Sequence, residues 1–221
     1  MGRTRTLPNS VTAVDDPDLA AYFTHCVDLC REEFGRWRKD LPAPFAVSFG
    51  GTVPRFQVQQ GAAQATITLT GSDWWQTRFE AGHEVLHWFA TPPGAQAEIL
   101  HWTHEMFAVE ISVLCLRRYA TNRALEHAEK CEQWLEQESA RASLEEMLTT
   151  PLVEPYDRFF GRAFVTGRAL QHAVSWERLK PLAFQLDGQQ RPDLRRWLNE
   201  LPGNLRRSAY SVLGEPTDAW V

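Results

Sequence analysis

Three residues in the first half of the chain have the types and spacing needed to bind a metal ion and activate water. His83, Glu84 and His87 form the pattern HExxH. Residues four apart on a helix project from the same face about one turn apart, so both imidazoles could hold one tetrahedral zinc ion. Glu84 would then face a water in the open position and could take its proton. The pattern therefore predicts a zinc site with hydrolytic chemistry.

The residues around this pattern favour a helix with defined ends. Asp73 is a candidate N-cap, and Gln76 would complete a capping box with it. Apolar residues follow at helical spacing, and Pro92 and Pro93 end the segment. The alternative is an ordinary amphipathic helix that carries two histidines. Burying a histidine pair among bulky apolar side chains costs free energy unless something satisfies both rings, which favours the metal site.

A second helix, predicted over residues 96–119, contains Glu105 within the segment His-Glu-Met-Phe-Ala. HExxH followed by a glutamate in this setting resembles the gluzincin zinc peptidases, whose aminopeptidases carry a similar Asn-Glu-Gly-Phe-Ala segment. Here His104 stands in the place of the asparagine and Met106 in the place of the glycine. Both departures make the match to any one subfamily loose.

The resemblance implies a role for each polar residue of the two segments. His83, His87 and Glu105 would be the ligands of one zinc ion per chain, and Glu84 would be the general base. Independently of the family, two histidines and one carboxylate together with a water are a common catalytic zinc arrangement.

Other residues of the second helix compete with Glu105 for the third ligand position. Glu98, His101 and Glu105 recur at helical spacing and would share one face. His101 would make a three-histidine site. Glu110 lies further round the helix. Alternatively, Glu98, His101 and Glu110 form a solvated polar stripe or hydrogen-bond to the ligands from outside.

A tyrosine further along the chain is a candidate for stabilising an oxyanion. Many gluzincins carry a tyrosine just ahead of a glycine-containing helix, and Tyr156 has a similar setting, although Gly161 follows later than in the aminopeptidases. The resemblance implies that its hydroxyl donates to the developing negative charge. A core or surface tyrosine is the alternative interpretation, and Arg162 and His172 are alternative donors.

The remaining pattern predicts an α+β protein that is mostly helical. An apolar stripe predicts a first helix over residues 18–39, and the segments after residue 119 are almost wholly helical. Between the first helix and the HExxH helix, alternating apolar residues predict a small sheet. Its strands are expected at residues 45–49, 53–59 and 65–70.

This order of strands, HExxH helix, glutamate helix and helical bundle resembles the zincin-like catalytic domains of gluzincins. We expect a single domain over residues 1–221, because no linker is visible. Its three parts would be an N-terminal helix and sheet, the zinc-site helices and a helical C-terminal part, which correspond to residues 17–71, 72–120 and 121–221.

Composition and charge indicate the cellular compartment and exclude some classes of partner. The formal net charge is −5 and no basic block appears, which argues against a nucleic-acid partner. The sequence has neither a secretory leader nor an apolar stretch long enough to span a membrane, so we expect a cytoplasmic protein without a membrane contact. The four cysteines form no CxxC pair and no disulfide framework, in agreement with that compartment.

The sequence thus predicts a zinc metallopeptidase that cleaves a specific peptide or protein substrate. In gluzincins an edge strand near the metal pairs with the extended peptide, which is β-augmentation. Two alternatives remain open. One is a non-catalytic module that binds a peptide or a protein on a gluzincin-like scaffold. The other is a zinc hydrolase that acts on a non-peptide bond, since zinc-activated water is not restricted to amides.

Overall fold

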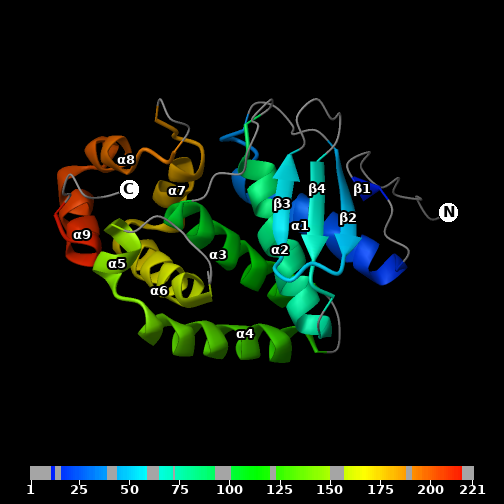
Figure 1. Ribbon diagram of the computed structural model, residues 1–221. Helices are drawn as coiled ribbons and strands as arrows, with labels where there is room; N and C mark the ends of the chain where they lie inside the picture. Colours follow the sequence, from blue (N-terminus) through cyan, green and yellow to red (C-terminus); the bar gives the residue numbers. More distant parts are fainter. Residues whose placement is uncertain are drawn as a thin grey trace.

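A small β-sheet lies beside a larger group of helices in the computed structural model of the protein (Figure 1). The sheet and the helices of the N-terminal half form one side of the molecule, and the helices of the C-terminal half form the other. The protein is therefore α+β and mostly helical, as predicted. The structure describes residues 11–12, 16–38, 44–58, 65–71, 73–92, 101–119, 123–149, 157–187 and 191–215.

The sheet has four strands among the described residues, in the order β1-β2-β4-β3. Strands β1, β2 and β4 run parallel, whereas β3 is antiparallel to β4 and forms one edge. The three predicted strands are confirmed with small changes at their ends, and the two-residue β1 was not predicted. The bounds are Val11–Thr12 for β1, Phe45–Phe49 for β2, Arg55–Val58 for β3 and Ala65–Leu69 for β4.

One face of the sheet packs on two helices, α1 (Pro17–Phe34) and α2 (Trp74–Ala90). Alternate residues of β2 and β4 are buried, as the period of a strand requires. The ring of Phe45 contacts Phe23 of α1 at 5.8 Å and Trp88 of α2 at 4.8 Å, measured between centroids. The HExxH helix is thus fixed against the sheet by aromatic packing.

Helix α2 lies in the interior. Every residue from 77 to 90 is buried, and the helix packs closely against α3 (Trp102–Arg118). The close approach depends on Gly82, because a Cβ at that position would lie 2.9 Å from the Cα of Ser112. Glu80 joins α2 to the end of β4 by accepting hydrogen bonds from the backbone and the hydroxyl of Thr70. Asp73 occupies the N-cap position without a side-chain capping hydrogen bond, so the predicted capping box is wrong.

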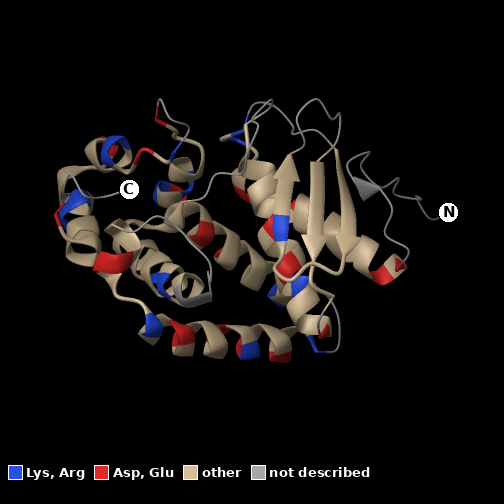
Figure 2. Ribbon diagram, in the orientation of Figure 1, with Lys and Arg blue, Asp and Glu red and all other residues tan. Residues whose placement is uncertain are grey.

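The C-terminal half is helical, and its central helix α6 packs against α3, α4 and α9. Charged residues follow the exposed side of α4 (Figure 2). The segment after α6 divides into α7 and a 3-10 helix, η2, which contains Pro181. The bounds are α4 Ala124–Glu138, η1 Ser139–Arg141, α5 Leu144–Thr149, α6 Asp157–Val174, α7 Trp176–Leu179, η2 Lys180–Ala183, α8 Leu194–Glu200 and α9 Gly203–Leu213.

None of the helices in the described ranges combines the length and the apolar character that crossing a membrane requires.

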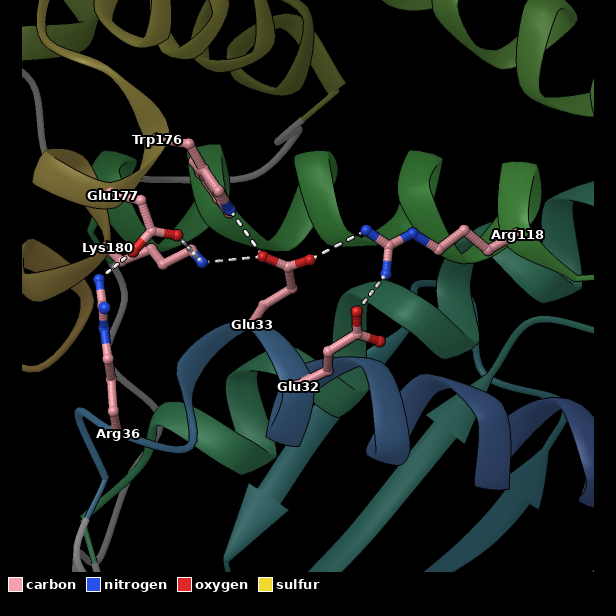
Figure 3. Close-up of polar contacts among 7 residues, drawn as sticks. All are labelled: Glu32, Glu33, Arg36, Arg118, Trp176, Glu177 and Lys180. Carbon is pink, nitrogen blue, oxygen red and sulfur yellow. Dashed lines mark hydrogen bonds and ion pairs between the residues drawn. The ribbon is translucent and has the colours of Figure 1, made fainter.

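A network of ion pairs joins α1, α3 and the segment of α7 and η2 (Figure 3). Glu33, near the end of α1, accepts a hydrogen bond from the indole of Trp176 at 2.9 Å. The same carboxylate pairs with Lys180 at 2.9 Å and with Arg118 at 3.0 Å. Lys180 is buried, so this pair is shielded from solvent. The network extends outward through three more exposed residues, Glu32, Arg36 and Glu177.

Substitution Gly82→Val should separate α2 from α3. The added side chain would meet the backbone at Ser112, which cannot move aside without shifting α3. We expect a loss of about 1–3 kcal/mol in the free energy of unfolding, measured by urea titration. Gly203→Val is a matched control, because nothing lies within 4 Å of a Cβ there. A Gly82 variant as stable as this control would show that the close approach is not needed for folding.

Substitution Lys180→Met should destabilise the fold in a pH-dependent way. Burial raises the pKa of Glu33, but hydrogen bonds from Lys180 and Trp176 outweigh it and hold this pKa below its usual value. The interaction therefore stabilises the fold above about pH 4 and is lost as the pH falls through the lowered pKa. We expect a loss of about 1–3 kcal/mol at pH 7 and a smaller loss at pH 3, measured by urea unfolding.

Arg36→Met provides the comparison for that experiment. Arg36 pairs with Glu177 at the exposed end of the same network, so its removal should cost only about 0–1 kcal/mol. An equal effect of Lys180→Met at both pH values would contradict the role assigned to Glu33.

Candidate metal centre

Two residues of α2 and one residue of α3 bring their polar atoms together. The Nε2 atoms of His83 and His87 lie 3.1 Å apart. Glu105 belongs to the first turn of α3. Its Oε2 lies 3.0 Å from Nε2 of His83, and its Oε1 lies 3.4 Å from Nε2 of His87. Within the described part of the chain, this is the group of His, Cys, Asp or Glu residues whose arrangement could hold a metal ion.

The three separations match those between the ligands of a small tetrahedral ion. With zinc–ligand bonds of about 2.0–2.1 Å, neighbouring ligand atoms of a tetrahedron lie about 3.3 Å apart. The Nε2–Nε2 distance of 3.1 Å lies near that spacing, as do the distances of 3.0 and 3.4 Å from the two different carboxylate oxygens of Glu105 to the nearer imidazole nitrogen of each. Two imidazole nitrogens and one carboxylate oxygen are also a donor set that zinc prefers. His83, His87 and Glu105 therefore fit a metal ion both in distance and in chemistry.

The site is buried, and both burial and the neighbouring charges affect the pKa values of His83 and Glu105. The side chains of His83, His87 and Glu105 are 4%, 2% and 5% exposed. Burial lowers the pKa of His83, although the carboxylate of Glu105 acts in the opposite direction. Burial raises the pKa of Glu105, but the two histidines outweigh it and leave this pKa well below its usual range. A neutral imidazole and an ionised carboxylate are the forms that bind metals.

Glu84 occupies the same buried stretch of α2 as the two histidines. It follows His83 in the helix and is 3% exposed. A position next to one histidine on a helix is rotated by about 100° from it, so its side chain leaves the helix beside the histidine face. The structure thus places a buried carboxylate on the helix that carries both imidazoles.

Two neighbours of the histidines were not singled out as site residues from the sequence. The ring of Phe160, in α6, lies 4.8 Å from that of His83, centroid to centroid. His104 lies 6.4 Å from His87 with the rings inclined by only 28°. His104 is next to Glu105 in the sequence, and this position could have marked it as a site residue. No feature of the sequence marked Phe160, because its contact with His83 joins distant parts of the chain.

The two competing third ligands that the structure describes, His101 and Glu110, do not join the group. His101 precedes α3 and caps it, since its Nδ1 accepts the backbone N–H two residues later at 3.2 Å. Glu110 forms an ion pair with Arg168 of α6 at 2.9 Å. Glu98 lies outside the described residues. Glu105 is thus the described candidate that lies beside both histidines.

The predicted oxyanion donor, Tyr156, lies outside the described residues. Arg162, the first alternative, donates to the backbone carbonyls of Ser139 at 2.6 Å and Ala142 at 2.8 Å. Its guanidinium therefore connects α6 to η1 and to the residue that follows η1. His172 is exposed near the C-terminal end of α6, whereas His83 contacts the first turn of that helix. The structure therefore favours neither Arg162 nor His172 for this role.

Comparisons with known proteins supply no relative for this arrangement. No protein-family model, no curated protein and no solved structure matches the chain. The case for a metal centre therefore rests on the residues and distances of the site itself.

Substitution Glu105→Ala should abolish metal binding, because it removes one of three converging donors. The wild type should carry about one zinc ion per chain by elemental mass spectrometry after dialysis against zinc. His101→Ala is the matched control, since it removes a cap from the same helix and should leave the metal content unchanged. Loss of zinc from the His101 variant, with retention in the Glu105 variant, would reverse the assignment of the third ligand.

Proposed function

We propose that this protein is a zinc-dependent peptidase with a gluzincin-like, zincin-like catalytic domain. The observation that carries the proposal is the convergence of His83, His87 and Glu105 at separations of 3.0–3.4 Å, within an HExxH context. A tetrahedral site with three protein ligands leaves one position for water or substrate, as catalytic zinc sites do.

Each residue of the site would have a distinct role in the reaction. His83, His87 and Glu105 would hold the ion, which when bound supplies a Lewis acid that polarises a carbonyl and lowers the pKa of water. Glu84 takes a proton from the attacking water and delivers it to the leaving amine. Glu84 is 3% exposed, which keeps bulk water away from this proton transfer.

The position of β3 supports a peptide as the substrate. β3 forms an edge of the described sheet, is antiparallel to β4 and packs near α2. An edge strand presents unpaired backbone N–H and C=O groups to which an extended chain can add. A peptide bound along Arg55–Val58 would run beside the helix that carries Glu84.

The depth of the site supports a second candidate function. Ligand side chains that are only 2–5% exposed would also suit a metal ion that holds the fold of a peptide-binding module. Such a site has no use for Glu84 as a base, because a structural ion is closed by its ligands. The role of Glu84 therefore distinguishes the two functions.

Substitution Glu84→Gln should lower kcat by at least about a hundredfold while the zinc content stays unchanged. The amide keeps the size of the side chain but cannot accept the proton of water. Hydrolysis of a fluorogenic peptide library provides the activity, and elemental mass spectrometry provides the zinc content. Glu126→Gln, on the exposed side of α4, is the matched control and should keep full activity.

Full activity of the Glu84 variant would overturn the mechanism. A wild type that binds zinc and cleaves no peptide in the library would favour the binding module.

A further inference from the structure

His104 is a buried residue that the proposed catalytic roles do not use. It precedes Glu105 in α3 and is 1% exposed. Its Nε2 lies 3.1 Å from the backbone carbonyl oxygen of Ala183, in η2. A carbonyl oxygen only accepts hydrogen bonds, so Nε2 of His104 carries the proton. This hydrogen bond fixes both the tautomer and the orientation of the ring.

The fixed ring lies against a proposed ligand. The rings of His104 and His87 are inclined by 28° with centroids 6.4 Å apart, within the range of offset aromatic contacts. On the other side of the ligand pair, the ring of His83 contacts His87 at 4.8 Å and Phe160 at 4.8 Å. Each histidine of the HExxH pair is thus supported by a ring from outside α2.

The carbonyl group that holds His104 is itself held in place. Ala183 ends η2, and Lys180 begins it. Lys180 is 5% exposed and pairs with Glu33 of α1 at 2.9 Å, while Trp176 donates to the same carboxylate (Figure 3). A shielded ion pair therefore anchors the short helix whose last carbonyl accepts the hydrogen bond of His104.

We propose that His104 is a positioning residue for the metal ligand His87, and that the carbonyl of Ala183 sets its orientation. This inference rests on the proposed metal site and adds a residue that touches neither the ion nor the substrate. Its physical effect is to restrict the ring of His87 to the orientation in which Nε2 points toward His83 and Glu105. Partners that hydrogen-bond metal-binding histidines commonly change metal affinity by about 10–100-fold when they are removed, and we expect this ring contact to act at the lower end of that range.

Two variants separate the packing of the ring from its hydrogen bond. His104→Phe keeps an aromatic ring beside His87 but has no donor for the carbonyl of Ala183. His104→Gln keeps an N–H donor near the position of Nε2 but loses the ring. His25→Phe is the matched control, because His25 is a partly buried histidine of α1 whose ring contacts are with Tyr22 and Tyr119.

The experiment measures zinc affinity by competition with a chromophoric chelator, on full-length protein whose folding is checked by circular dichroism. The visible spectrum of bound cobalt(II) reports the ligand geometry independently of activity. We expect His104→Phe to weaken zinc binding about tenfold or more and to alter the cobalt spectrum. His104→Gln should recover part of the affinity, and His25→Phe should match the wild type.

Three results would overturn the inference in different ways. Wild-type affinity and spectrum in folded His104→Phe would remove His104 as a positioning residue and leave the proposed peptidase intact. An equal loss in His25→Phe would show that the effect follows from general destabilisation. A wild type that binds no zinc or cobalt would overturn the inference together with the proposed function.

Discussion

The close contact between α2 and α3 is the constraint on which the rest of the structure depends. Gly82 allows the backbones to approach at Ser112, where a side chain would clash. The approach occurs one residue before His83, and it lets the first turn of α3 bring Glu105 within 3.4 Å of both imidazoles. If the helices lay further apart, the buried polar groups of His83, His87 and Glu105 would lose their contacts with one another. That loss would cost several kcal/mol in the free energy of folding.

The polar groups at the contact between α2 and α3 are buried, and their burial affects both stability and chemistry. Both helices are surrounded by apolar side chains over most of their length, so the converging atoms of His83, His87 and Glu105 lie where little water reaches them. A hydrogen bond between an imidazole N–H and an ionised carboxylate is stronger in such a setting, because little water competes for it. In the proposed reaction, the same shielding would strengthen the electrostatic interactions of a charge that develops beside Glu84.

Residues of the C-terminal half contact the histidines of the site region. Helix α6 brings Phe160 onto His83, and η2 brings a carbonyl onto His104, which lies against His87. Buried Lys180 connects that carbonyl to α1 through Glu33. Segments from both halves of the chain thus support His83, His87 and Glu105, and rigid support of this kind is what a precise metal geometry requires.

The sequence by itself determined the local features of this protein. Helical spacing placed His83 and His87 on one face, and alternation located three strands, because both patterns depend only on nearby residues. Only the tertiary structure decided among the third-ligand candidates, since His101 and Glu110 found other partners in a cap and in an ion pair. The contacts of Phe160 and His104 likewise join residues far apart in the chain. Periodicity has no information about such contacts, because they depend on how whole helices pack.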